Sequence, residues 1–167
     1  MQTQSSSRSR PPGIATVAIE RRFQGPDGIA NGGYLAGRFG GSGPSRIVLR
    51  SPARVDIPLQ AVRTHFGLTL LDGETQILSV ERSNAPDPVA QHASAQEIDD
   101  LPAPDLTAHP FPHCFVCGPD NDHGLHIVFK ETPSGVAANF SLTAEGSNGV
   151  PSHVSIAGAL DCSSGWA

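Results

Sequence analysis

Residues 31–41 have the sequence NGGYLAGRFGG, and this stretch decides the predicted fold class. Asn31 is a favourable N-cap residue and Gly40-Gly41 is a typical helix stop, so the stretch predicts a short helix. A strand is expected before it, over residues 16–23. After it, the apolar residues change to the alternation of β-strands, and turn-forming residues separate the expected strands at 46–50, 59–65 and 75–81. The order strand, helix, three or more antiparallel strands predicts an α+β fold in which the helix covers one face of the sheet.

The rest of the chain predicts an arm, a linker and a second unit. Residues 1–13 are rich in Ser, Arg and Pro, which is typical of a flexible arm, and residues 14–84 form the first unit. Residues 85–112 are acidic and Pro-rich, which favours a linker. Residues 113–167 begin a second unit: a hairpin with strands at 124–130 and 136–142, then a helix from Pro151. Because one helix on one hairpin buries little surface, we expect this unit to be incomplete and to be completed by another chain.

Composition excludes several classes of protein. Hydrophobic residues make up 38%, which is ordinary for a globular chain once the 18 Gly are added. No apolar run approaches about 18 residues, so no membrane-spanning helix is expected. The first residues have no apolar core, so no secretory signal is expected. The three Cys then indicate reduced thiols in a cytoplasmic protein.

Charge is distributed unevenly along the chain. Residues 1–65 hold nine Arg and three acidic residues, a net charge of +6, and the remaining residues have a net charge of −11. The basic half favours a polyanionic partner, either nucleic acid or the phosphates of a nucleotide-bearing cofactor. The Arg residues are scattered and aromatics are only 5%, so nucleic-acid binding is not expected.

Two further motifs resemble those of a known family. Residues 114–125 are CFVCGPDNDHGL and residues 159–167 are ALDCSSGWA, with the predicted hairpin between them. This order resembles the hotdog-fold acyl-CoA thioesterases of the PaaI-like group, which carry an Asp in the middle of their long helix. Residues 31–33 resemble the helix start where many relatives have His-Gly-Gly. The resemblance implies a double hotdog, each unit an antiparallel sheet wrapped around a helix, with the second unit incomplete in its helix.

The resemblance also implies an activity and the residues that perform it. The expected reaction is hydrolysis of an acyl-CoA or a related thioester by a homo-oligomer that needs no cofactor. Asn31, Gly32 and Gly33 would polarise the thioester carbonyl, because a helix N-terminus favours an oxyanion, and Tyr34 would lie beside the acyl group. Asp161 would be the catalytic nucleophile or the base towards water. The alternative for residues 31–33 is a plain Asn-Gly turn with a helix cap. The alternative for Asp161 is an exposed helix carboxylate or one that caps a nearby N–H.

The two units differ from the family pattern in complementary ways. In the first unit Gly40 stands where the family's Asp is expected. In the second unit Ser152, His153 and Val154 stand where relatives have His-Gly-Gly. One functional site per pair of units is therefore expected. The same differences support the alternative function, a non-catalytic acyl-CoA-binding or structural hotdog protein.

Cysteine and histidine residues suggest a second kind of site. Cys114 and Cys117 followed by His123 and His126 have the residue types of a zinc site, and a loop could bring in His109 or His113. The His-x-x-His spacing is short, however, and the resemblance implies a structural turn, so no metal site is expected. A small zinc-binding module over 109–126 is the third alternative.

Cys162 and five arginines are further candidates for a catalytic or phosphate-binding role. Cys162 follows Asp161 directly on the predicted helix, so the two should face different directions. A nucleophile pair of Cys162 with His153 is excluded because nine residues place them on opposite helix faces. Five arginines could contact coenzyme A phosphates, although solvated strand positions are the commoner role of such residues: Arg21, Arg22, Arg46, Arg50 and Arg54.

Overall fold

The protein has an α+β fold, as the sequence predicts. Its structure, a computed structural model, describes residues 13–41, 43–84, 94–133, 135–140 and 152–165. The elements of the N-terminal part are β1 (Gly13–Val17), the 3-10 helix η1 (Arg21–Phe23), α1 (Gly32–Phe39), β2 (Ser45–Leu49), β3 (Leu59–Arg63), β4 (Gly67–Asp72) and β5 (Thr75–Arg82). They are followed by α2 (Ala95–Asp99), β6 (Lys130–Thr132), β7 (Gly135–Ala137) and α3 (His153–Ser164). The predicted arm lies outside the described residues except for Gly13, which begins β1.

The first five strands form one antiparallel sheet in the order β1-β3-β4-β5-β2. Three expected strands are confirmed as β2, β3 and β5, and β4 is a further strand between β3 and β5. The expected strand over 16–23 is wrong beyond Val17, where β1 ends, and η1 follows at Arg21–Phe23. In β4 Leu68 and Leu70 alternate with less buried residues, so both side chains enter the core.

Helix α1 begins and ends where the sequence predicts. The Asn31 side-chain oxygen accepts a hydrogen bond from the Tyr34 N–H at 2.8 Å, which caps the helix start. At the other end the Gly40 N–H donates to the Ala36 carbonyl. Tyr34, Leu35 and Phe39 are buried in the same core as the inward-facing residues of the sheet.

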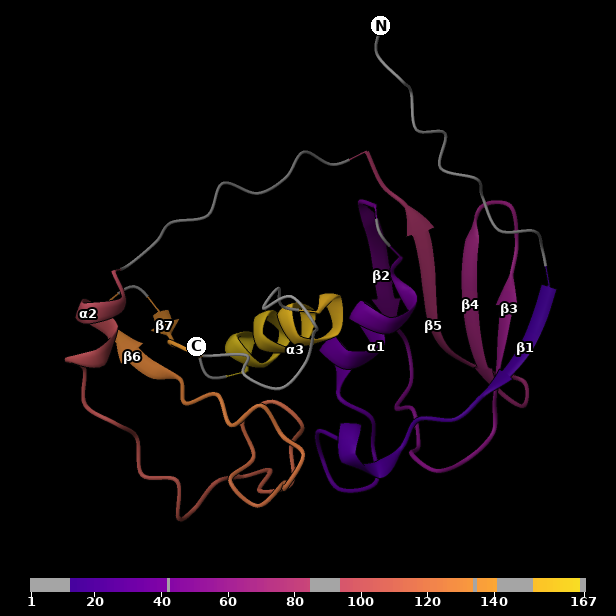
Figure 1. The fold of residues 1–167 in the computed structure, drawn as a ribbon. Helices are drawn as coiled ribbons and strands as arrows, with labels where there is room; N and C mark the ends of the chain where they lie inside the picture. The colour runs from indigo at the N-terminus through magenta and orange to yellow at the C-terminus, as the bar shows by residue number, and fades with distance from the viewer. Residues whose placement is uncertain (1–12, 42, 85–93, 134, 141–151, 166–167) are drawn as a thin grey trace, which may run out of the picture.

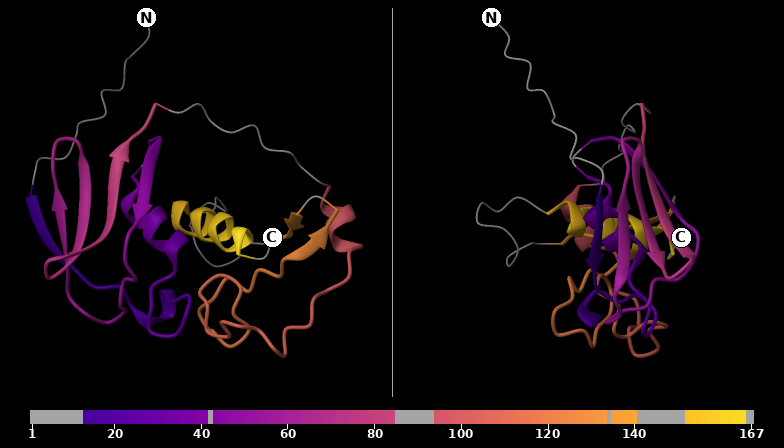
Figure 2. Two further views of the ribbon diagram at one scale, coloured as in Figure 1. Left: turned by 180° about the vertical axis from the view of Figure 1, so that it is seen from behind. Right: turned by 90° about the vertical axis from the view of Figure 1, so that its right-hand side faces the viewer.

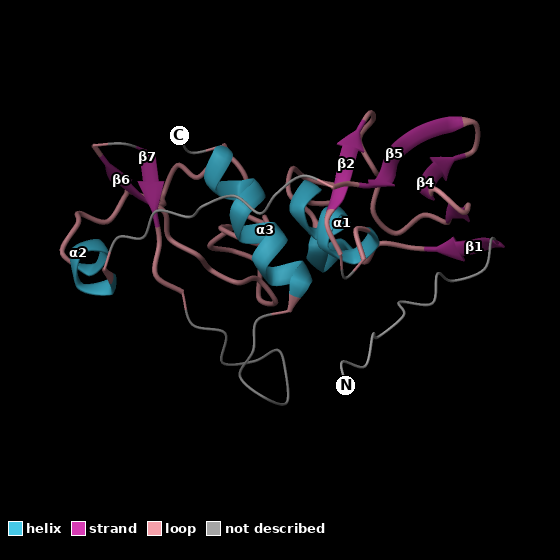
Figure 3. Ribbon diagram, turned by 90° about the horizontal axis from the view of Figure 1, so that it is seen from above, coloured by secondary structure: helices cyan, strands magenta, loops and turns pink. Residues whose placement is uncertain are grey.

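Helices α1 and α3 lie side by side between the two sheets of the molecule (Figures 1 and 3). Two glycines of α1 make this approach possible. A Cβ atom at Gly33 would lie 2.4 Å from the Ala157 carbonyl oxygen, and one at Gly37 would lie 2.5 Å from the Val154 Cα. These atoms belong to the α3 backbone and have no room to move aside. Gly33, expected to admit a substrate carbonyl, therefore also has a packing role.

The remaining segments complete the same core. A hairpin forms as β6 and β7, with only three residues in each strand. The strand expected at 124–130 is wrong except at Lys130, and the strand expected at 136–142 is confirmed only at 136–137, with 141–142 outside the described residues. Before it, Phe115, Val116 and Ile127 are buried together with Leu59 and Leu70 of the sheet. The first and second segments therefore share one hydrophobic core.

The expected linker contains one turn of helix, α2. Ser94 and Glu97 form a capping box, in which the Ser94 Oγ accepts the Glu97 N–H at 3.2 Å and the Glu97 carboxylate accepts the Ser94 N–H at 2.8 Å. Further views show α2 beside the β6–β7 hairpin (Figure 2). No helix in the described residues is long and apolar enough to cross a membrane.

Candidate functional site

The structure brings Asp161 to the N-terminus of α1. The Gly33 N–H donates a hydrogen bond to Asp161 Oδ2 at 2.9 Å, across 128 residues of sequence. The first amides of a helix carry a partial positive charge and have no carbonyl partner within the helix, so a carboxylate is stabilised there. The catalytic candidate and the Asn31-Gly32-Gly33 stretch, predicted from separate motifs, thus lie in contact.

A cavity of about 320 Å³ opens at this contact. Asn31, Gly32 and Asp161 line it, and His109, Pro110 and Phe111 form another part of its wall. Among the described residues no acceptor is found for the Gly32 N–H, whereas the next two amides of the helix donate to Asp161 and Asn31. The Gly32 amide is therefore the helix-start donor available to a ligand oxygen in this cavity.

Tyr34 lies in the core instead of the cavity wall. Its ring stacks on Phe23 with centroids 4.0 Å apart and meets the edge of Phe115. Burial raises the pKa of the Tyr34 hydroxyl, and the nearby Arg38 offsets part of that rise. The side chain holds α1 against η1 and the second segment, and it is not among the residues that line the cavity.

Three cysteines meet on the other side of the same cavity. Cys114 and Cys117 come from the Cys-x-x-Cys turn and Cys162 comes from α3. The Cys162 Sγ lies 3.7 Å from the Cys114 Sγ and 3.8 Å from the Cys117 Sγ. The sequence predicts that Cys162 and Asp161 face different directions on the helix, yet both line this cavity.

Hydrogen bonding within the cysteine cluster separates the acidities of its thiols. Hydrogen bonds from Cys117 and then Cys162 lower the pKa of the Cys114 thiol well below its ordinary value. The hydrogen bond with Cys114, followed by the weaker effect of the one with Cys117, raises the pKa of the Cys162 thiol above its ordinary value. Cys114 is therefore the most acidic thiol of the cluster whose pKa shift is resolved.

The histidines suggested as zinc ligands are not part of this cluster. Among the described residues the group of ligand atoms lying within 4.8 Å of one another consists of the three sulfurs. His123 and His126 are exposed, and His126 has a φ of 50°, outside any strand. Sequence reasoning missed Cys162 as a member, because tertiary packing and not spacing brings it to the turn.

The arginines considered for phosphate binding lie outside the cavity wall. Three of them form exposed ion pairs: Arg21 with Asp56 at 3.1 Å, Arg22 with Glu20 at 3.0 Å, and Arg54 with Asp72 at 2.8 Å. None of the five lines either cavity described here. Their positions support the commoner role of such arginines, which is that of solvent-exposed residues without a phosphate ligand.

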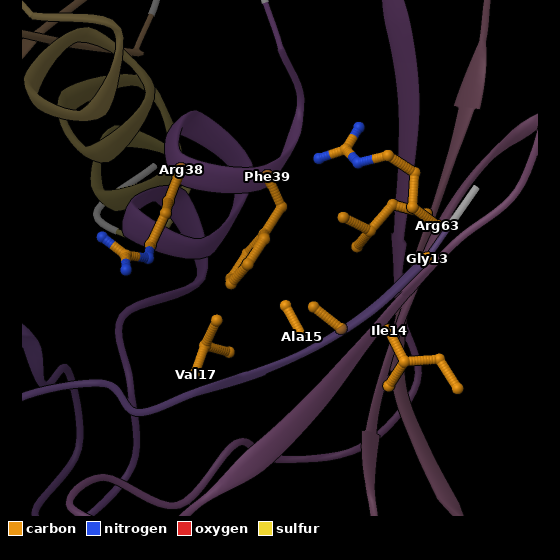
Figure 4. Close-up of a pocket in the computed structure, with 9 residues that line it drawn as sticks. Gly13, Ile14, Ala15, Val17, Arg38, Phe39 and Arg63 are labelled. Atoms are coloured by element: carbon orange, nitrogen blue, oxygen red, sulfur yellow. The ribbon is translucent and has the colours of Figure 1, made fainter. Parts of the chain in front are cut away.

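A second cavity, of about 430 Å³, lies between α1 and the edge of the large sheet (Figure 4). Val17, Phe39 and Leu68 supply apolar wall, and Arg38 and Arg63 supply charge. It contains none of the residues predicted to act on a substrate. The cavity beside Asp161 is therefore the better candidate site.

Comparison of the chain with protein-family models, with curated proteins and with solved structures finds no match.

Proposed function

We propose that this protein is a thioesterase-like hydrolase that acts on an acyl-CoA or a related thioester, with a double-hotdog architecture. Two features support the architecture. An antiparallel five-stranded sheet shares its core with α1, and α3, from the segment that carries the second set of motifs, packs directly against α1. In a double hotdog the thioester would lie between these two helices.

The cavity contains the groups that such a reaction needs. The Gly32 N–H would donate to the thioester carbonyl oxygen and stabilise the negative charge that develops on it. Asp161 would either take a proton from an attacking water or attack the carbonyl carbon itself. In the second route the attack forms a mixed anhydride on Asp161, which water then hydrolyses to restore the carboxylate. In both routes the C–S bond breaks, the sulfur leaves as a thiolate that takes up a proton, and water supplies the oxygen of the released acid.

One observation carries the proposal: the Asp161 carboxylate contacts the start of α1 at the wall of a cavity that the Gly32 amide also lines. The test is a panel of acyl-CoA substrates assayed for release of free thiol, with the protein's own cysteines subtracted through a substrate-free blank. Asp161→Asn should lower turnover at least about 100-fold, in the range typical of a lost acid–base group. Asp122→Asn, which makes the same change at an exposed position, should leave turnover unchanged. Equal turnover of the wild type and Asp161→Asn would remove this mechanism.

A non-catalytic acyl-CoA-binding protein is the second candidate, and one contact favours it. The Gly33 amide, part of the proposed carbonyl-polarising stretch, already donates to Asp161 and is not available to a substrate oxygen. Calorimetric titration with coenzyme A and a non-hydrolysable acyl-CoA analogue separates the two functions. Binding without turnover of any substrate in the panel would favour this candidate.

Two further expectations belong to the same proposal. The protein would act as a homo-oligomer, which sedimentation velocity tests directly, and a stable monomer with an ordered second segment would count against it. It would act in the cytoplasm, where its three cysteines stay reduced. Imaging of the tagged chain with compartment markers checks that location.

A further inference from the structure

We propose that Cys114, Cys117 and Cys162 bind one zinc ion, with the fourth coordination position facing the cavity beside Asp161. The inference rests on the arrangement of the sulfurs and does not depend on the proposed hydrolase activity. It differs from the zinc module considered from the sequence, because the third ligand comes from α3 and no histidine of residues 109–126 is required.

The separations of the sulfur atoms fit a tetrahedral metal site. With a Zn–S bond of about 2.3 Å, two sulfurs at a tetrahedral angle lie about 3.8 Å apart. The Cys162 Sγ lies 3.7 Å and 3.8 Å from the other two sulfurs, and all three lie within 4.8 Å of one another. A disulfide requires a separation of about 2.05 Å, and all three cysteines are free thiols.

The backbone around the first two cysteines holds their sulfurs on one side of a tight turn. The Gly118 N–H donates to the Cys114 carbonyl at 3.0 Å, which closes the turn. A Cβ atom at Gly118 would lie 2.3 Å from the Cys114 nitrogen and 2.5 Å from the Pro112 oxygen, so only glycine fits there. The ligand positions are therefore set before any metal binds, which lowers the cost of ordering them.

Donors that stabilise metal-bound thiolates surround the cluster. Asn31 Nδ2 lies 3.6 Å from the Cys162 Sγ and 3.8 Å from the Cys114 Sγ, and the Val116 N–H donates to the Cys114 Sγ at 3.5 Å. Outer-shell hydrogen bonds of this kind orient ligands and tune their basicity. Asn31 is held in place by its cap to the Tyr34 amide, so the cluster is connected to the start of α1.

The cluster favours zinc over hard cations. Soft thiolates select zinc and other thiophilic metals, whereas magnesium and calcium take oxygen ligands. Cysteine binds metal in its thiolate form. Binding of Zn²⁺ therefore forms three Zn–S bonds and releases the protons carried by the thiols to solvent.

His109 lines the same cavity, but its hydrogen bonding argues against it as the fourth ligand. The Phe111 N–H donates to His109 Nδ1 at 3.0 Å, so the neutral ring carries its proton on Nε2. A metal at either nitrogen would require that arrangement to change. The fourth position is therefore assigned to water or to a ligand that enters the cavity, as in sites with three protein ligands.

The test measures metal binding by the whole chain without any activity readout. The purified protein is reduced, stripped with a chelator and titrated with zinc chloride alone against a chromophoric zinc indicator. We expect about one zinc per chain. The three thiols of the zinc-bound protein should react with a disulfide reagent at least tenfold more slowly than those of the stripped protein. Excess magnesium or calcium should not compete with zinc. Cobalt(II) should give the visible bands of a tetrahedral site and a sulfur-to-metal charge-transfer band.

Variants assign the ligands. Cys162→Ser should lower the zinc affinity at least tenfold and weaken the charge-transfer band, whereas the neighbouring Ser163→Ala and the cavity variant His109→Ala should bind zinc as the wild type does. Asp161→Asn should also keep its zinc, so loss of hydrolysis and loss of metal are distinguishable. Circular dichroism verifies that each variant is folded, and the thiol-protection measurement on the wild type needs no variant. Reduced, folded wild type that binds no zinc, or zinc binding unchanged in Cys162→Ser, would overturn the proposal.

Discussion

Replacing Gly33 with Ala should destabilise the protein although alanine is the better helix former. The added Cβ would lie 2.4 Å from the Ala157 oxygen, 2.6 Å from the Gly158 Cα and 2.7 Å from the Asp161 Cβ. Overpacking against such atoms costs about 1–3 kcal/mol or more, and the helix preference of Ala over Gly offsets about 0.5–1 kcal/mol. We therefore expect a net loss of about 1–2 kcal/mol, because the α3 backbone must move away from α1.

Urea unfolding followed by circular dichroism measures this change as a lower midpoint at constant slope. Gly32→Ala is the matched control, since it makes the same substitution one residue earlier in α1. Its Cβ would lie 3.0 Å from Asp161 Oδ2 and from Leu49 Cδ1, which are the far ends of side chains that can rotate away. It should change the stability by less than about 0.5 kcal/mol. If Gly33→Ala is as stable as the wild type, the close packing of α1 on α3 is not as described.

Three further predictions concern stability. Asn31→Ala should cost about 1 kcal/mol through loss of the cap to the Tyr34 amide, and Asn31→Ser should recover most of it in the same urea assay; an unchanged midpoint for Asn31→Ala would contradict the cap. Phe115→Ala should lower the free energy of unfolding by about 3–5 kcal/mol because the ring is fully buried, whereas Phe66→Ala, at 84% exposure, should change it by less than about 0.5 kcal/mol. Similar effects of the two substitutions would argue against a shared core. Asp161→Asn should lower the free energy of unfolding by no more than about 1 kcal/mol, since an exposed carboxylate at a helix start contributes about 0.3–1 kcal/mol. A much larger loss in thermal unfolding would mean that the effect of this substitution on turnover is structural.

Much of the first unit could be predicted because its signals are local. The side-chain oxygen of Asn31 and the Gly40-Gly41 stop delimit α1 without help from the rest of the fold. Leu68 and Leu70 of β4 show the same alternation as the predicted strands, so that strand was within reach of the pattern. The Ser94–Glu97 capping box was likewise a local signal for α2.

Other features depend on tertiary packing and could not be predicted in this way. Gly33 and Gly37 are close to α3 only after the two helices meet, so the sequence did not indicate their role in helix packing. Cys162 joins a turn 45 residues away, beyond any spacing rule for metal ligands. Tyr34 is adjacent to the site in sequence, yet the direction of its side chain takes it into the aromatic cluster with Phe23.

The 128 residues between Gly33 and Asp161 also have a consequence for synthesis on the ribosome. At about 5–20 residues per second, α1 leaves the ribosome roughly 6–25 s before the partner helix follows. During that interval its glycine face has no helix to pack against, and the sheet behind it lacks the aromatic residues contributed by the later segment. Long-range contacts of this kind slow folding, so the packing face of α1 stays exposed until α3 has been made.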